Sequence, residues 1–318
     1  MTQPAIPGSW AFHKAPRIIV LVLALVSLQA PSEQQAGPQK IVMPVAGGTI
    51  EITLPGEPME VSSKDLLDWV KAKSAAVSQY YGHFPVAHLT LRIRADASSG
   101  IHHGVTYPKD GGLILIAVGH GATVAGLTDD WVLTHEMIHL AFPSMAENHH
   151  WIEEGLSTYI EPIARAQAGQ MPVAEVWKQF LRDMPKGQPA PGDEGLDQTP
   201  TWGRTYWGGA MFCLLADVEI RERTHNRKGL QDALRAILDH GGIITKDWEI
   251  KKTLAVGDKA TGTRVLLELY EKMRDKPAPA DLGQLWENLG LELKDGKVTF
   301  NDKAVDAAIR KAITSPRP

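Results

Sequence analysis

The segment His135-Glu136-Met137-Ile138-His139 constrains this chain more than any other feature. It lies in an apolar-periodic stretch that predicts a helix over residues 128–142, which Pro143 ends. Side chains four residues apart share one face of a helix, so His135 and His139 can reach the same metal ion. Glu136 points to an adjacent side, where a carboxylate can deprotonate a metal-bound water. The same spacing also arises by chance, so a coincidental motif on an ordinary core helix is one alternative.

A third metal ligand is expected nearby, because a catalytic zinc ion has three protein ligands and one open position. Glu153 and Glu154 lie at the start of the next predicted helix, residues 152–167. Only one of two adjacent carboxylates can face the ion well. We choose Glu154, because Gly155 beside it permits close packing of the two helices, and we expect Glu153 to be a solvated residue of the helix start. No spacing links the histidines at 149–150 to the motif, so we do not expect them to be ligands.

The composition is that of a globular protein. The chain has 318 residues, 22% of them charged and 43% hydrophobic, with a formal net charge of -4. This mildly acidic balance gives no reason to expect a nucleic-acid partner. Cys213 is the only cysteine, which excludes a zinc ribbon or a disulfide framework, and its apolar surroundings predict a buried side chain. The sequence does not indicate an oligomeric state.

The N-terminus has the layout of a secretory signal: a basic flank, a short apolar run at 18–28, and a polar segment with small residues. A membrane span needs about 20 residues, more than this run provides. Cleavage after Ala30 would leave Pro31 at the new terminus, which favours cleavage after Ala36. We therefore expect residues 1–36 to be a signal peptide and the protein to be exported, to the periplasm or outside the cell. An uncleaved membrane anchor and a buried strand are the alternatives.

The remaining residues, 37–318, are expected to form one α+β domain. Its first part, 37–145, should hold a sheet and the motif helix, and its second part, 146–318, should be helical. We expect strands at 41–45, 49–54, 89–94, 104–107 and 112–118, with residues 46–48 as the turn between the first two. Ser62 or Ser63 can cap a helix that runs through residues 65–81 and that Gly82 ends. We expect further helices at 173–184, 206–224, 230–238, 262–274, 281–289 and 303–312, with a loop at 185–200 and a turn at 294–297.

The metal motif and the segment after it resemble the gluzincin peptidases. In that family HExxH is followed by a Trp-x-x-Glu-Gly-x-x-x-Tyr segment that supplies the glutamate ligand, and Trp151, Glu154, Gly155 and Tyr159 match it. The gap between His139 and Glu154 is shorter than in the large M1 aminopeptidases and is more similar to compact peptidase MA-like proteins. The resemblance implies a Zn²⁺ cofactor held by His135, His139 and Glu154.

A second match lies downstream. The run Tyr206-Trp207-Gly208-Gly209-Ala210 resembles the Tyr-x-x-Gly-Ala helix of M1 and M61 enzymes, and residues 285–313 resemble the closing segment of M61-like enzymes. The likeness covers residues 130–315. It implies that Tyr206 donates a hydrogen bond to the oxyanion. It also implies a thermolysin-like fold, with an active-site cleft between an N-terminal lobe carrying an edge-strand sheet and a C-terminal helical lobe.

One part of the family pattern is absent: the sequence has no Gly-x-Met-Glu-Asn segment, which in M1 enzymes recognises the free amine of the substrate. Exopeptidase action is therefore not supported. The strand at 111–118 is expected to take the substrate-edge position and pair with a peptide backbone. Asp217 is a candidate partner for the motif histidines, or else a surface charge. The stretch from Trp202 to Trp207 is equally consistent with a place in the hydrophobic core and with a subsite for the substrate.

These features predict zinc-dependent hydrolysis of peptide bonds, with a metal-activated water, Glu136 as general base and Tyr206 as oxyanion stabiliser. The substrate would be a peptide or protein, and a membrane would be a partner only if the N-terminal segment stays uncleaved. The alternative is an exported zinc- or peptide-binding protein without turnover. Retention of Glu136 and Tyr206 argues against it, because a purely structural zinc site needs neither residue.

Overall fold

The computed structural model describes residues 38–317, so the predicted signal peptide, 1–36, lies outside the described residues. The first part of the described chain is a five-stranded sheet in the order β1-β2-β3-β5-β4, with β2, β3 and β5 parallel and the outer pairs antiparallel. The strands are β1 (Lys40–Val45), β2 (Gly48–Thr53), β3 (His88–Asp96), β4 (Ile101–Tyr107) and β5 (Leu113–Gly119). The sheet is therefore mixed, as an α+β domain allows.

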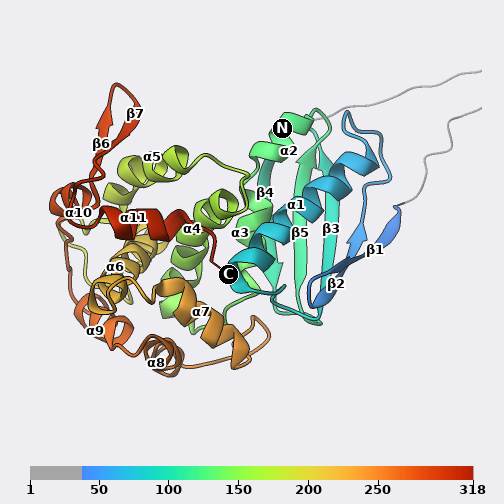
Figure 1. Cartoon of the computed structure of the whole chain (residues 1–318). Coiled ribbons are helices and arrows are strands. Elements are labelled where there is room, and N and C mark those ends of the chain that lie inside the picture. The colour runs from blue at the N-terminus through green and yellow to red at the C-terminus, as the bar shows by residue number, and fades with distance from the viewer. Residues whose placement is uncertain (1–37, 318) are drawn as a thin grey trace, which may run out of the picture. The chain divides into compact units, whose positions relative to one another are not determined.

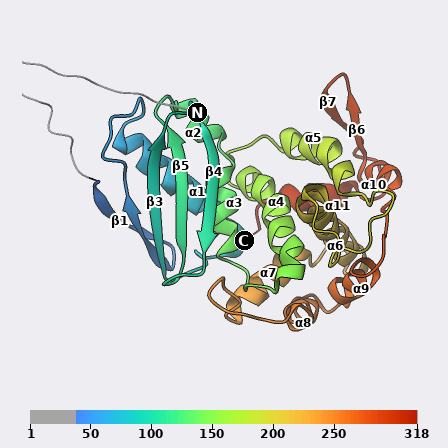
Figure 2. The ribbon, with the colours of Figure 1, turned by 180° about the vertical axis from the view of Figure 1, so that it is seen from behind.

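The sheet buries one face under helices. In β5, Ile114, Ile116 and Val118 alternate with half-buried neighbours, which is the pattern of a strand with one covered face. Figures 1 and 2 show α1 (Ser63–Tyr81) and α3 (Val132–His139) against this face from opposite viewpoints. Of the two serines that could cap α1, Ser62 is the cap, and it forms a capping box with Asp65. Gly82 ends the helix as predicted, in the left-handed region at φ 92°.

The edge of the sheet nearest α3 is β4. The prediction that residues 111–118 would be the edge strand is wrong: β5 pairs with β3 on one side and with β4 on the other, so it is internal. Alternating hydrophobicity predicts that a segment is a strand but not its place in the sheet order. The exposed strand edge beside the metal motif therefore belongs to β4.

The single helix predicted over residues 128–142 is two helices, α2 (Val124–Asp129) and α3. Asp130 lies between them, and its carboxylate accepts hydrogen bonds from the backbone N–H groups of Val132 at 2.9 Å and Leu133 at 3.1 Å. The same carboxylate accepts from Trp69 Nε1 of α1 at 3.1 Å. Asp130 is therefore an N-terminal cap of the motif helix and also fixes it to α1.

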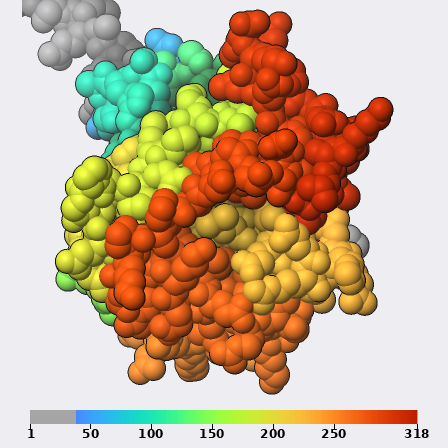
Figure 3. Space-filling model, turned by 90° about the vertical axis from the view of Figure 1, so that its left-hand side faces the viewer, coloured from blue at the N-terminus to red at the C-terminus, as the bar shows by residue number. Residues whose placement is uncertain are grey.

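The rest of the chain is helical apart from one small hairpin. The helices are α4 (His150–Gln167), α5 (Val173–Asp183), α6 (Gly209–Arg223), α7 (Leu230–Asp239), α8 (Ile250–Thr261), α9 (Val265–Met273), α10 (Leu282–Leu289) and α11 (Ala307–Thr314). Helix α8 was not predicted. The hairpin of β6 (Leu291–Lys294) and β7 (Lys297–Phe300) was predicted only as a turn, without its two strands. Figure 3 shows the face formed largely by the C-terminal elements, in orange to red. Across the described residues, no helix is long and apolar enough to span a bilayer.

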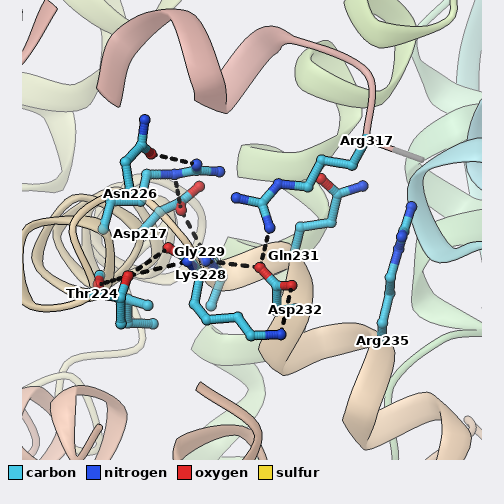
Figure 4. Close-up of polar contacts among 12 residues, drawn as sticks. Asp217, Thr224, Asn226, Lys228, Gly229, Gln231, Asp232, Arg235 and Arg317 are labelled. Carbon is cyan, nitrogen blue, oxygen red and sulfur yellow. Dashed lines mark hydrogen bonds and ion pairs between the residues drawn. The ribbon is translucent and has the colours of Figure 1, made fainter. Parts of the chain in front are cut away.

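Buried polar contacts join α4, α6 and α7. Asp217 of α6 accepts hydrogen bonds from Tyr159 Oη of α4 at 3.0 Å, from Arg221 Nε at 2.7 Å and from the N–H of Leu230 at 2.9 Å. Figure 4 shows Asp217 among these C-terminal polar contacts, with the ion pair between Arg317 and Asp232 beside it. Asp217 is only 2% exposed, so it is not a surface charge. Its hydrogen bonds join these helices and do not involve the motif histidines. The predicted burial of Cys213, on the same helix, is confirmed at 1% exposure.

Candidate metal centre and catalytic site

Helices α3 and α4 bring the three predicted metal ligands together. His135 Nε2 lies 3.1 Å from Glu154 Oε2, and His139 Nε2 lies 3.7 Å from Glu154 Oε1. One donor atom from each of the three residues lies within 4.8 Å of the others. His135 and Glu154 are buried, and the His139 side chain is 14% exposed. The group therefore forms a nearly enclosed cluster of two imidazoles and one carboxylate.

The geometry of this cluster fits a zinc ion. Two donors bound at about 2.1 Å in tetrahedral geometry lie about 3.4 Å apart. The separations of 3.1 Å from His135 Nε2 to Glu154 Oε2 and of 3.7 Å from His139 Nε2 to Glu154 Oε1 fall on either side of that value, and each imidazole lies near a different oxygen of the carboxylate. Two histidines and one glutamate also match a known catalytic donor set, which leaves one coordination position open.

The protonation states also fit metal binding, which requires neutral imidazoles and an ionised carboxylate. Burial is the main cause that lowers the pKa of His139 to about 4, so this ring is neutral at neutral pH. Burial raises the pKa of Glu154, but the hydrogen bond with His135 and the neighbouring imidazoles outweigh it and lower the pKa to about 2. At neutral pH the cluster thus offers a carboxylate and, at His139, a free nitrogen lone pair.

Glu136 lies on the side of α3 that faces β4. Its Oε2 accepts a 2.6 Å hydrogen bond from Thr106 Oγ1 of β4. The approach depends on Gly104, because a Cβ there would lie 2.6 Å from Glu136 Cγ and 2.9 Å from Val132 Cγ1. Burial raises the pKa of Glu136, while His135 and the Thr106 hydrogen bond lower it. A partly desolvated, oriented carboxylate of this kind is suited to proton transfer.

Tyr206 reaches the cluster from the segment before α6. It lies in η3 (Gly203–Gly208), a single π-helical turn, and its ring stacks on that of His135 with centroids 6.4 Å apart. Burial, followed by the charges of Glu154 and Glu136, raises the pKa of Tyr206 to about 12. The phenol is therefore protonated at neutral pH and can donate a hydrogen bond.

Gly155 has a different contact from the predicted one. It packs not against the motif helix but against the start of α6, where a Cβ on Gly155 would lie 2.3 Å from Gly209 Cα. In return, a Cβ on Gly209 would lie 2.1 Å from the carbonyl oxygen of Trp151. The two glycines let α4 and α6 approach closely, which places the Tyr206 segment beside Glu154.

All five predicted site residues line one cavity of about 510 Å³: His135, Glu136, His139, Glu154 and Tyr206. The side opposite α4 is formed by residues 102–106 of β4. The cavity is thus bounded by the sheet edge, by helices α3 and α4 and by the π-helical turn.

The neighbouring acidic and histidine residues have roles that the sequence did not reveal. Glu153 is not a plain solvated residue, because its Oε1 accepts from the N–H of Met145 at 3.3 Å and its Oε2 lies 3.3 Å from His150 Nδ1. His150 Nε2 also lies 3.3 Å from Glu154 Oε1, on the outer side of the cluster. His149 instead contacts Asp197 at 3.3 Å, away from the ligands.

Two hydroxyl groups complete the site and were not predicted. Thr106 contacts Glu136, and Ser157 Oγ of α4 lies 3.3 Å from His139 Nδ1, where it can fix the ring orientation. Ser157 lies three residues after Glu154, so helical spacing offered a signal for it. Thr106 lies 30 residues before Glu136 on a strand, and no local spacing connects the two.

Comparisons with known proteins find a similarity between the structure of this chain and solved structures. No protein-family model matches this chain, and no curated protein matches it. An aminopeptidase N family protein from Idiomarina loihiensis is similar with a TM-score of 0.61 and 11% identity, over 81% of this chain and 50% of that chain. An M1 zinc metallopeptidase from Deinococcus radiodurans matches with a TM-score of 0.48 and 12% identity, over 76% of this chain and 54% of that chain. This chain therefore spans about half the length of these solved proteins, and the first likeness shows a shared fold.

Proposed function

We propose that this chain is a zinc-dependent peptidase of the gluzincin type, with His135, His139 and Glu154 as the metal ligands. The observation that carries the proposal is the convergence of these donors with Glu136 and Tyr206 on one cavity. A structural zinc site is closed by four protein ligands, whereas this cluster has three beside an open cavity. The fold shared with an aminopeptidase N family protein supports the same assignment.

Zinc bound at this site would polarise the scissile carbonyl and lower the pKa of a bound water. Glu136, oriented by Thr106, takes the proton of the attacking water and passes it to the leaving amine. Tyr206 donates its phenolic hydrogen to the oxyanion of the tetrahedral intermediate. The edge of β4 forms one side of the cavity, so an extended peptide can lie along it.

We further propose that the cavity is the active-site cleft between an α+β lobe, 37–145, and a helical lobe, 146–318, as in thermolysin-like zincins. We also retain the proposal that residues 1–36 direct export. The N-terminal sequence and mass of the protein recovered from the periplasm or medium test this: a start at residue 37 supports export, and a full-length cytoplasmic product contradicts it.

The proposed function is tested by metal content and hydrolysis measured on the same samples. We expect about one zinc per chain in the wild type and in Glu136→Gln, and hydrolysis of mixed peptides by the wild type alone. His139→Ala should lose both zinc and hydrolysis. If the wild type and Glu136→Gln both hold zinc and neither cleaves peptides, the protein is a binder without turnover. If His139→Ala retains full zinc, the metal site is elsewhere.

A further inference from the structure

Two tryptophans lie beside the catalytic cavity, each one helical turn before a residue that lines it. Trp131 precedes His135 by four residues, and their ring centroids lie 5.6 Å apart. Trp202 precedes Tyr206 by four residues and stacks on it at 6.0 Å. The two tryptophans are 52% and 60% exposed. Large apolar side chains gathered at one place on a surface are typical of a binding site.

A second cavity, of about 550 Å³, begins at these tryptophans and shares Trp131, His135 and Tyr206 with the catalytic cavity. We call it the aromatic pocket. Its walls include Trp131, Glu161, Arg165, Met171, Trp202 and Trp207. Glu161 and Arg165 continue the face of α4 that begins at Glu154, so the pocket extends along this helix directly from a metal ligand.

The two buried carboxylates of the aromatic pocket already have cationic partners. Glu161 and Arg165, each 3% exposed, form an ion pair at 2.8 Å. Asp183, also 3% exposed, pairs with Arg182 at 2.6 Å and with Lys186 at 2.7 Å. A charged ligand group buried beside Glu161 and Arg165 would compete with their ion pair, and an unpaired buried charge is costly. An apolar group leaves this ion pair intact and gains contact with the tryptophan rings.

We propose that the aromatic pocket binds a large aromatic or aliphatic side chain of the substrate, at a position next to the scissile bond. Trp131 and Trp202 are its specificity-determining walls. Continuity with the catalytic cavity at His135 and Tyr206 places the bound side chain within one residue of the reacting carbonyl. The placement of the pocket next to the scissile bond rests on the proposed peptidase function. The choice of an apolar side chain as its ligand rests on the residues that line the pocket. Of the two tryptophans at 202 and 207, Trp202 is an exposed wall of the pocket, whereas Trp207, which also lines it, is 6% exposed and packs in the hydrophobic core.

The test is a series of quenched fluorescent peptides with Ala, Leu, Phe, Glu or Lys on either side of the cleaved bond. We expect the zinc-loaded wild type to favour Phe and Leu over Ala and Glu by about tenfold or more in kcat/KM at one of these positions. Trp202→Ala should lower kcat/KM for the Phe and Leu peptides by about tenfold more than for the Ala peptide, so that the preference is lost. An absence of preference in the wild type, or an equal loss for every peptide in Trp202→Ala, overturns the inference.

Phe300→Ala is the matched control. Phe300 is an aromatic residue, 42% exposed, with a cation over its ring as Lys186 lies over Trp202. It lies on β7, outside both cavities. The wild-type preference should persist in this variant. A loss of preference in it would show that the effect of Trp202→Ala is not local, and so would overturn the assignment.

Binding measurements test the pocket assignment independently of the proposed peptidase function. Dissociation constants of the same peptides are measured with zinc-loaded Glu136→Gln by tryptophan fluorescence, with and without Trp202→Ala. If Phe peptides bind about tenfold more tightly than Ala peptides and Trp202→Ala removes the difference, the pocket assignment stands even where no peptide is cleaved. If peptides are cleaved but neither rate nor binding depends on the side chain, the pocket assignment fails and the peptidase function stands.

Discussion

Gly155 of α4 and Gly209 of α6 are in backbone contact, so close that a Cβ on Gly155 would lie 2.3 Å from Gly209 Cα. One helix carries Glu154 and the other follows Tyr206, so this crossing sets the position of the proposed oxyanion donor relative to the proposed metal ligand. Two helices can approach this closely only where both residues lack a side chain.

Gly155→Ala is therefore expected to destabilise the protein by about 1 to 3 kcal/mol, because the extra methyl group must displace backbone atoms. Displacement of Tyr206 by about 1 Å should also lower kcat/KM by about 100-fold. Denaturant unfolding and peptide hydrolysis measure the two effects. Gly126→Ala is the control, since its added Cβ would meet only Thr123 Oγ1 at 3.4 Å. A Gly155→Ala protein as stable and active as this control would refute the role of the crossing.

Thr106→Val removes the hydroxyl that donates to Glu136 at 2.6 Å while keeping the shape of the side chain. Hydrogen bonds to charged groups contribute about 1.5 to 3 kcal/mol, so kcat should fall at least about tenfold. The hydrogen bond lowers the pKa of Glu136, so its loss should raise that pKa and shift the acid limb of the kcat/KM profile to higher pH. Thr106→Ser retains the hydroxyl and should keep both the rate and the pH profile. A Thr106→Val enzyme with the wild-type profile would exclude this contact from catalysis.

Tyr206→Phe tests the oxyanion donor. The ring and its stacking on His135 remain, and only the phenolic hydroxyl is lost. Removal of one oxyanion donor lowers kcat by about 100- to 1000-fold, and KM and zinc content should change little. Steady-state kinetics with metal analysis separate these quantities. A change confined to KM would assign Tyr206 to substrate binding instead.

Lys73 of α1 gives a prediction about stability that is independent of the metal site. It is 1% exposed, its Nζ donates to the carbonyl of Thr128 at 2.9 Å, and burial is the main cause that lowers its pKa to about 8. Between that pKa and the value near 10.5 of an unfolded chain, the unfolded state binds more protons, so stability attributable to Lys73 rises with pH. The free energy of unfolding of the wild type minus that of Lys73→Met should therefore increase by about 2 to 3 kcal/mol from pH 7 to above pH 10. A difference that does not change with pH would show that Lys73 titrates normally in the folded protein.

The sequence predicted much of the framework, because helical periodicity and caps are local. Ser62 and Gly82 set the ends of α1, and the four-residue spacing of His135 and His139 put both rings on one face. Glu154 lies with His135 and His139 in one cluster, but Gly155 beside it packs on Gly209 of α6, which its place in the sequence did not predict.

What could not be predicted depends on contacts distant in sequence. The order of strands in a sheet is not encoded in any one strand, so the edge was assigned to 111–118 rather than to β4. Thr106 contacts Glu136 only because β4 is that edge. Asp130, expected near the start of a longer helix, instead separates α2 from α3: its carboxylate caps α3 and also accepts from Trp69 of α1, a contact between residues 61 positions apart.

The central claim is peptide hydrolysis that depends on zinc and on Glu136. It is tested most directly by digesting a terminally labelled peptide library with zinc-loaded wild type and zinc-loaded Glu136→Gln, with the metal content of both verified. The account predicts new peptide termini with the wild type, loss of cleavage on chelation, and a rate at least about 1000-fold lower with Glu136→Gln. The positions of the new termini also distinguish internal from terminal cleavage. Equal cleavage by both proteins, or no cleavage by the zinc-loaded wild type, would contradict it.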